Sequence, residues 1–178
     1  MKRFSLGFAL MAISGMAMAN TGTIQFKGKI TDATCPIEVV DPISGGNGSI
    51  INLGTYTKDF FTAAKDRTRP VSFQLLIKDG AACGFAAGDE VTVTYSGLDG
   101  SDSEFYLIKP GADAAKNIAI ALQDNTRKDV PPDTPSSAYK VNETGESRLN
   151  FTAAMVATTN AVTAGAVDAD VQFVVNLP

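Results

Sequence analysis

Residues 22–35 read GTIQFKGKITDATC and alternate apolar and polar side chains with the two-residue period of a β-strand. Ile24, Phe26 and Ile30 fall on one face of this strand, and two lysines fall on the other. Gly28 interrupts the apolar row where a further large side chain is expected. Because a glycine weakens a strand, it commonly marks a bulge or a close approach by another backbone or side chain. The stretch therefore predicts either a bulged first strand or a strand suited to pairing with another chain segment.

The chain before this stretch has the order of a secretory signal peptide. Lys2 and Arg3 precede an apolar run, FSLGFALMAI, and the small residues AMA follow at positions 17–19. We therefore expect a signal peptide at residues 1–19 and a mature chain that begins at Asn20. The apolar run has about ten residues, fewer than the roughly 20 needed to cross a bilayer, so we predict no membrane span.

The composition is typical of one folded domain, since 44% of the 178 residues are apolar and 19% are charged. Removal of Lys2 and Arg3 with the signal peptide leaves 13 basic against 19 acidic side chains, a net charge of −6. Because nucleic-acid binding is driven largely by lysine and arginine, this charge argues against a nucleic-acid partner. The chain has no histidine, which excludes a histidine-dependent base, catalytic triad or metal site.

Cys35 and Cys83 are the two cysteines of the chain. In an exported protein a pair of cysteines favours a disulfide over two free thiols. No CxxC motif is present, so we expect a structural staple rather than a redox site.

Alternating runs recur along the chain and are separated by pieces rich in Gly, Pro, Asp, Asn and Ser, which favour turns. This spacing predicts an all-β sandwich. Residues 55–67 are expected to form a long connection with at most a helical turn or two. The runs expected to form strands after the first are residues 49–54, 70–77, 90–96, 104–109, 117–123, 147–158 and 169–177.

Asp99, Asp102 and Glu104 form the most notable group of carboxylates. Paired carboxylates can hydrolyse glycosides or hold calcium, but this group lacks the spacing and closing glutamate of an EF-hand loop. An exposed hairpin turn is the better interpretation. We therefore expect neither an enzyme nor a bound cofactor or metal.

Several of these features together resemble the subunits of chaperone-usher fimbriae, the type 1 and P pilus group. Phe26, Gly28 and Ile30 match the F-x-G-x-apolar motif, and Cys35 follows it. The stretch VSFQLLIKDGAACG places Cys83 after a strand, and NIAIALQD follows at residues 117–124. The closing segment TAGAVDADVQFVVNLP matches the family's terminal strand, with a glycine fourteen residues from the C-terminus. That glycine is Gly165.

The resemblance implies an incomplete immunoglobulin-like β-sandwich that lacks its last strand and is completed by a donor strand from a neighbouring subunit. Residues 20–34 would be the N-terminal donor-strand extension, and residues 35–178 the pilin domain. Alternate side chains of the donor would enter pockets along the neighbour's groove, with the glycine over a pocket too shallow for a side chain. The donor residues are then Phe26, Gly28 and Ile30 at the motif positions, and Ile24 joins them on the alternation of the strand alone.

The resemblance also implies the partners. Copies of the chain would form a homopolymer together with other fimbrial subunits, after transfer from a periplasmic chaperone by an outer-membrane usher. The chaperone would pair with the terminal strand, and many members carry an aromatic residue at the penultimate position, which is leucine here. The terminal-strand residues implied are Gly165, Val171, Phe173, Val175 and Leu177.

The implied function is that of a structural subunit of a bacterial surface fimbria that supports adhesion, exported through the periplasm to the cell surface. A tip adhesin usually has an additional receptor domain, for which the 159 residues after the signal peptide leave no room, so the major shaft subunit is favoured. The alternative is a self-sufficient secreted β-sandwich that binds a carbohydrate or a protein. The absence of tryptophan counts against a carbohydrate-binding module.

Overall fold

The computed structural model describes residues 35–40 and 48–178. The signal peptide and the extension predicted from the sequence lie outside the described residues. A short 3-10 helix, η1 (Lys58–Phe60), lies within the connection where a helical turn was expected. The strands are β1 (Ile37–Val40), β2 (Val71–Ile77), β3 (Glu90–Gly97), β4 (Tyr106–Leu107), β5 (Ile118–Gln123), β6 (Tyr139–Lys140), β7 (Ser147–Ala157) and β8 (Val171–Asn176).

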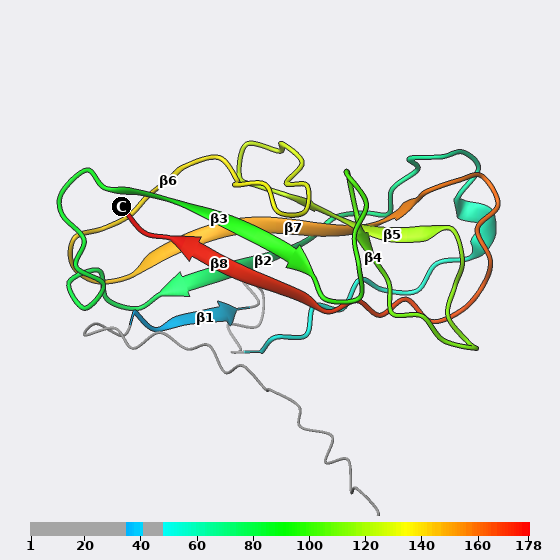
Figure 1. The fold of residues 1–178 in the computed structure, drawn as a ribbon, viewed down its shortest axis with the longest axis horizontal. Coiled ribbons are helices and arrows are strands. Elements are labelled where there is room, and N and C mark those ends of the chain that lie inside the picture. The colour runs from blue at the N-terminus through cyan, green and yellow to red at the C-terminus, as the bar shows by residue number, and fades with distance from the viewer. Residues whose placement is uncertain (1–34, 41–47) are drawn as a thin grey trace, which may run out of the picture. The chain divides into compact units, whose positions relative to one another are not determined.

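These strands form two antiparallel sheets (Figure 1). One has five strands in the order β1-β2-β7-β5-β4, and the other has three in the order β6-β3-β8. The last strand, β8, lies along β3, from which it is separated by more than seventy residues of sequence. The two sheets bury a shared apolar core, which confirms the predicted all-β immunoglobulin-like sandwich.

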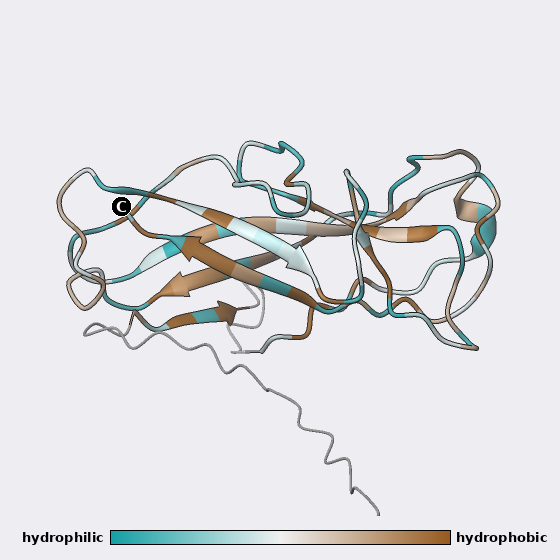
Figure 2. Ribbon diagram, in the orientation of Figure 1, coloured by the Kyte–Doolittle hydropathy of each residue, from teal (hydrophilic) through white to brown (hydrophobic). Residues whose placement is uncertain are grey.

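The alternation of apolar residues places one face of each sheet in the core. On β3, for example, Val91, Val93 and Tyr95 are all buried and point toward the opposite sheet. The Tyr95 ring meets Phe151 of β7 edge-on at 5.2 Å between ring centroids, and Phe151 stacks on Phe73 of β2 at 5.7 Å. Figure 2 shows the resulting recurrence of hydrophobic residues along β2 and β8. Aromatic packing between the sheets therefore fills the centre of the sandwich.

A second, smaller cluster covers part of the outer face of the five-stranded sheet. It consists of Phe105, Ala119, Ala121 and Val156. The Arg67 guanidinium lies 5.7 Å from the centre of the Phe105 ring and binds Asp129 through two hydrogen bonds of 2.7 Å. This cluster explains why β5 and the second half of β7 are buried on both faces.

The structure differs from the sequence prediction at three places. Residues 49–54 pair with no strand of the described chain, although Ile51 and Leu53 face the core while Ile50 is 89% exposed. Their alternation thus follows burial, but no neighbouring strand supplies a ladder of hydrogen bonds. The run at residues 104–109 yields only the two-residue β4. The short strands β1 and β6 were not predicted.

Within residues 35–40 and 48–178, no helix has the length and hydropathy of a membrane-spanning segment.

Candidate functional site

Among the strands of residues 35–40 and 48–178, β8 has a partner on one side only. It pairs antiparallel with β3 along its whole length, from Val171 opposite Gly97 to Asn176 opposite Thr92. No other strand of the described chain pairs with its second edge. A strand edge of this kind presents unpaired N–H and C=O groups to any chain that approaches it. The three-stranded sheet is therefore open at β8.

A groove of about 930 Å³ opens beside this edge. One wall is the segment 162–171 that leads into β8, and the other is the unpaired segment 49–56. The floor consists of buried side chains of both sheets, and these are mostly apolar. The floor residues are Phe73, Leu75, Tyr95, Ala115, Ile118, Ile120, Leu122, Ala153 and Met155. The groove thus reaches the hydrophobic core of the sandwich directly.

The inner face of β8 borders this groove. Val171, Phe173 and Val175 are half-buried and pack against the core, while the residues between them are exposed. The rings of Phe173 and Tyr95 lie 6.3 Å apart between centroids. Leu177 follows the end of β8 and is 46% exposed, so it does not share this inner-face burial. The alternation expected from the sequence is present within β8, and pairing with a chaperone stays a prediction.

Gly165 lies in the wall of the groove. Its neighbour Ala166 forms a parallel bridge with Ala114, supported by hydrogen bonds from the Ala115 N–H to the Ala166 carbonyl and from the Ala166 N–H to the Asp113 carbonyl. A Cβ atom on residue 165 would come within 2.4–2.7 Å of backbone atoms of residues 113–115. The wall can pack this closely only because residue 165 has no side chain.

The start of β8 is fixed by polar contacts of Asp170. Its N–H donates to the Asp99 carboxylate at 2.8 Å, and its carbonyl accepts from the Leu98 N–H at 2.9 Å. Its carboxylate pairs with the Lys109 ammonium at 2.9 Å. The hydrogen bond to Asp170 raises the pKa of Lys109. These contacts hold the start of β8 in place beside β3, while no strand of the described residues pairs with its outer edge.

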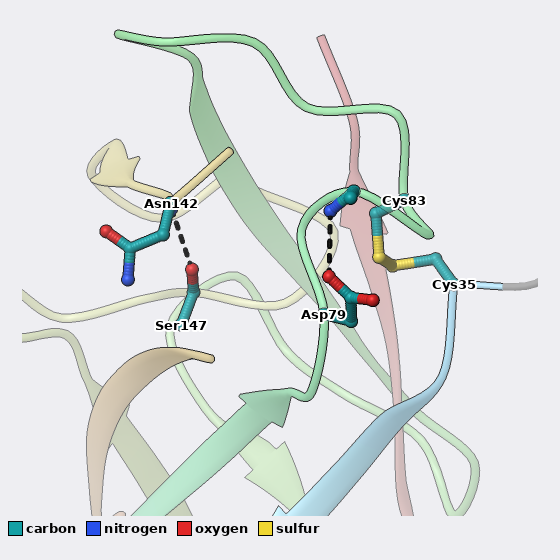
Figure 3. The surroundings of a disulfide bond; sticks show 6 residues. Cys35, Asp79, Cys83, Asn142 and Ser147 are labelled. Carbon is teal, nitrogen blue, oxygen red and sulfur yellow. Dashed lines mark hydrogen bonds between the residues drawn. A yellow bond between two sulfur atoms is a disulfide. The ribbon is translucent and has the colours of Figure 1, made fainter. Parts of the chain in front are cut away.

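The disulfide predicted between Cys35 and Cys83 is present, with 4.6 Å between the Cα atoms (Figure 3). It joins Cys35, two positions before the start of β1, to Cys83 in the loop between β2 and β3. In that loop the Asp79 carboxylate accepts a hydrogen bond from the Ala81 N–H at 3.1 Å. Among the described strands, β1 pairs only with β2, over four residue pairs. The disulfide therefore anchors an edge strand whose Val39 lines the groove.

Asp99, Asp102 and Glu104, the carboxylates considered above as a hydrolytic or calcium site, have structural roles. Asp102 accepts hydrogen bonds from the N–H groups of Glu104 and Phe105, which closes the turn before β4. Glu104 pairs with Lys65, and Asp99 holds the start of β8. The three side chains thus point to different partners and do not converge on one site.

The donor residues predicted from the sequence, Ile24, Phe26, Gly28 and Ile30, lie outside the described residues. Sequence reasoning did not identify the floor of the groove, because its residues come mainly from four different strands. Their alternation along each strand is the same as that of any other core residue. The segment 161–170 did carry one signal, since it has alanines at four positions and a glycine at a fifth. Small residues of this kind permit the close packing seen in the wall.

Comparison with known proteins finds fimbrial proteins by both sequence and structure. The family model described as "Fimbrial protein" matches residues 24–177. The fimbrial-like protein FimF of Salmonella typhimurium is 27% identical, over 99% of this chain and 98% of that protein. The probable major fimbrial subunit LpfA of Escherichia coli O157:H7 is 30% identical, over 93% and 92%. A solved structure of a chaperone-usher pilus superimposes with a TM-score of 0.58 at 22% identity, covering 93% of this chain and all of that one.

Proposed function

The chain belongs to the fimbrial protein family as a subunit of the chaperone-usher type, and on this premise we propose that it is the major shaft subunit of a fimbria. It polymerises by donor-strand exchange and supports adhesion from the cell surface. Its role is structural rather than enzymatic. The observation that carries the proposal is the apolar groove beside the unpaired edge of β8.

The groove has the chemistry of a site for an added β-strand. Backbone groups along the free edge of β8 provide a ladder, and the apolar floor provides contacts for alternate side chains. Peptide binding by β-augmentation combines these two elements, and pilin donor-strand complementation is an established example of this recognition mode. A strand with large apolar residues at every second position fits such a groove.

The N-terminal extension of a second copy supplies this strand. Ile24, Phe26 and Ile30 alternate on one face around Gly28. Burial of three large apolar side chains contributes roughly 5–9 kcal/mol before the costs of ordering the strand. Ladder hydrogen bonds to β8 fix the register. Residues 20–34 are therefore the donor, and residues 35–178 form the domain that accepts it.

Polymerisation follows from the arrangement of donor and acceptor. The donor of one copy fills the groove of the next, so the contact is heterologous and leaves a free donor and a free groove at the ends. Repetition of such a contact gives an open helical filament rather than a closed ring. Other fimbrial subunits with the same groove and donor enter the same fibre.

Before assembly, the exposed groove needs a cover. A periplasmic chaperone provides it by pairing with the terminal strand, where Val171 and Phe173 line the groove and Val175 packs against the core beyond it. Gly165 and Leu177 lie before and after these residues in the chain. An outer-membrane usher then replaces the chaperone strand with the donor strand of the next subunit. The chain thus passes through the periplasm to the cell surface.

Assignment to the shaft rests on likeness to a major subunit. The chain matches the probable major fimbrial subunit LpfA over nearly the full length of both proteins. The proposed donor segment, residues 20–34, precedes the sandwich domain of residues 35–178. A subunit of this composition both donates and accepts a strand, as a shaft requires.

The test is thermal unfolding of a variant that lacks residues 20–33, released from its chaperone, with and without a synthetic peptide of residues 20–34. A large rise in the unfolding midpoint on addition of the peptide is expected, because the peptide completes the sandwich. A truncated protein that is already stable and indifferent to the peptide would mean that the sandwich is complete without a donor, which contradicts the proposal.

A further inference from the structure

Four strands lie at the edges of the two sheets in the part of the chain that the structure describes: β1, β4, β6 and β8. β1 has four residues, and β4 and β6 have two each. Edge strands as short as these protect a sheet against pairing with other chains. β8, with six residues, is the longest of the four edges.

β3 lies inside the three-stranded sheet, but β6 covers little of its second edge. β3 has eight residues, and β6 pairs with the first two of them. Beyond β6, residues 93–95 of β3 lie against residues 131–136, which we call the covering segment. The covering segment forms no regular strand, although Pro135 makes an isolated antiparallel bridge with Thr94. Without this segment, β3 would present a second long edge.

The covering segment binds main-chain groups of β3. The Asp133 N–H donates a hydrogen bond to the Tyr95 carbonyl at 2.8 Å. The Ser136 N–H donates to the Val93 carbonyl at 2.9 Å, and the Ser136 hydroxyl accepts from the Val93 N–H at 3.0 Å. Ser136 thus takes up both main-chain groups of Val93, which a strand pairing with this edge would need.

The covering segment adds little to the hydrophobic core. Of its residues only Ser136 is buried, while Asp133, Thr134 and Pro135 are exposed. A further polar contact holds the segment in place, since the Ser96 hydroxyl donates to the Asp133 carboxylate at 2.5 Å. The position of the segment on β3 is therefore due to hydrogen bonds at the strand edge and not to burial of apolar side chains.

The outer side of the covering segment is unsuited to continuing the sheet. Pro131, Pro132 and Pro135 have no N–H to donate to a further strand. Proline at a sheet edge is one of the means by which proteins prevent edge-to-edge pairing. Asp133 has a left-handed backbone, with φ 57°, which interrupts the extended course of the chain. The segment therefore covers β3 without forming a new edge.

Resting on the proposed function, we propose that the covering segment restricts strand addition to β8, so that each subunit has one acceptor edge and the fibre does not branch. The contact that it prevents is one between two copies of this chain. Two uncovered β3 edges can pair antiparallel with each other, and such an isologous contact would join two subunits side by side.

The experiment uses the full mature chain with residues 131–136 replaced by Gly-Ser-Gly-Ser-Gly-Ser, co-expressed with its chaperone. The replacement keeps the length of the connection to β6 and removes the three prolines and the side chains that bind β3. In this complex the chaperone already occupies the edge of β8, so association between complexes must use another edge. Sedimentation velocity should show the wild-type complex as one species and a shift of the variant toward species of twice that mass.

Ser96→Lys, added to the replaced chain, separates edge pairing from a general loss of stability. The Ser96 hydroxyl has lost its Asp133 partner in that chain, so the lysine breaks no remaining contact of the covering segment. A lysine on an edge strand opposes pairing with another strand but cannot restore the lost hydrogen bonds. We expect the association to disappear while the unfolding midpoint stays below that of the wild type.

Ser136→Ala is a smaller change that tests the same contact if the replaced chain does not fold. It removes the acceptor of the Val93 N–H and should speed hydrogen exchange of that amide roughly fivefold or more, the equivalent of one neutral hydrogen bond. The same complexes should associate measurably at high concentration. Thr134→Ala is the matched control, because its hydroxyl donates to the Pro132 carbonyl at 3.3 Å, and it should change neither readout.

The outcomes separate this inference from the function on which it rests. If the wild-type chain forms no complex with a chaperone, the proposed function is contradicted. If it forms the complex and both the replaced chain and Ser136→Ala sediment as the wild type does, the covering segment does not restrict strand addition. Association that persists after Ser96→Lys would come from unfolding and not from the edge of β3, which would also overturn the inference.

Discussion

Gly165 lies so close to Ala115 that a Cβ atom on residue 165 would stand 2.4 Å from the Ala115 amide nitrogen. The same atom would stand 2.7 Å from the Asp113 carbonyl oxygen. Both backbone groups are engaged in hydrogen bonds to Ala166, so neither can withdraw without loss of those bonds. The glycine is required by this contact and not by a left-handed backbone, since its φ is not positive.

Gly165→Ala should therefore lower the free energy of unfolding by about 1–3 kcal/mol, the usual cost of forcing a methyl group into a packed site. Denaturant unfolding of the chain bound to its donor peptide measures this change. Gly48→Ala is the control, because no heavy atom lies within 4 Å of a Cβ at that position. Equal stability of the two variants would show that the wall of the groove accommodates a methyl group at residue 165 without loss.

Phe173→Asp should prevent accumulation of the subunit in the periplasm. The half-buried ring faces Tyr95, and a carboxylate in its place would be brought against the apolar core without a partner. The measurement is the periplasmic level by immunoblot when the chaperone is co-expressed. Val174→Asp places the same charge on the outer face of β8, at a residue that is 52% exposed, and should accumulate normally. Wild-type levels of Phe173→Asp would argue against a core strand paired with a chaperone.

Gly28→Leu should abolish fibre assembly and leave chaperone binding intact. The leucine adds a side chain where the proposed donor strand faces a shallow part of the groove, so the strand cannot seat. Electron microscopy of surface fibres and co-purification with the chaperone give the two readouts. Lys29→Leu adds the same side chain on the opposite face of the strand and should assemble. Normal fibres from the Gly28→Leu variant would contradict the assignment of this glycine.

Asp124 should give the fold a measurable dependence on acid. Burial raises the pKa of its carboxyl group, but hydrogen bonds from Ser137 and Thr126 outweigh burial and lower the pKa from 3.8 to about 2. Because the folded pKa lies below the unfolded one, the ionised carboxylate stabilises the fold above about pH 4, and this contribution is lost as the pH falls toward 2.

Asp124→Asn should accordingly lower the free energy of unfolding by about 2 kcal/mol at pH 7. The difference from the wild type should shrink between pH 4 and pH 2, as followed by denaturant unfolding at each pH. The exposed Asp59, changed to Asn in parallel, should show no comparable loss at pH 7. A difference that stays constant across this range would mean that the loop does not depend on the ionised form.

The long strands were predictable because each alternates on a half-buried face. The predicted run 90–96 covers all of β3 but its last residue, and the run 169–177 contains the whole of β8, for this reason. β1 was not predicted, because the four residues IEVV are too few to show a period. Its strand structure depends on pairing with β2 and on the disulfide, and both are tertiary contacts.

The groove was only partly predictable. The alternation of Val171, Phe173 and Val175 identified the strand that borders it. The segment 49–54 was predicted as a strand from the same kind of pattern, but a strand also needs a neighbour, which the described chain does not provide there. Tyr95 gave no signal, since a buried tyrosine in an alternating strand is the ordinary case.

In the proposed fibre, the position of the disulfide would determine where tension enters each subunit. The proposed donor segment ends at residue 34, so a pulling force from the neighbouring subunit enters the domain at Cys35. Without the disulfide, that force would act first on β1, an edge strand of four residues that could peel away from β2. The bond to Cys83 passes the load instead into the loop between β2 and β3, the strands at the centre of the two sheets' shared core. In such a fibre the disulfide would make the subunit a mechanical link as well as a folded domain.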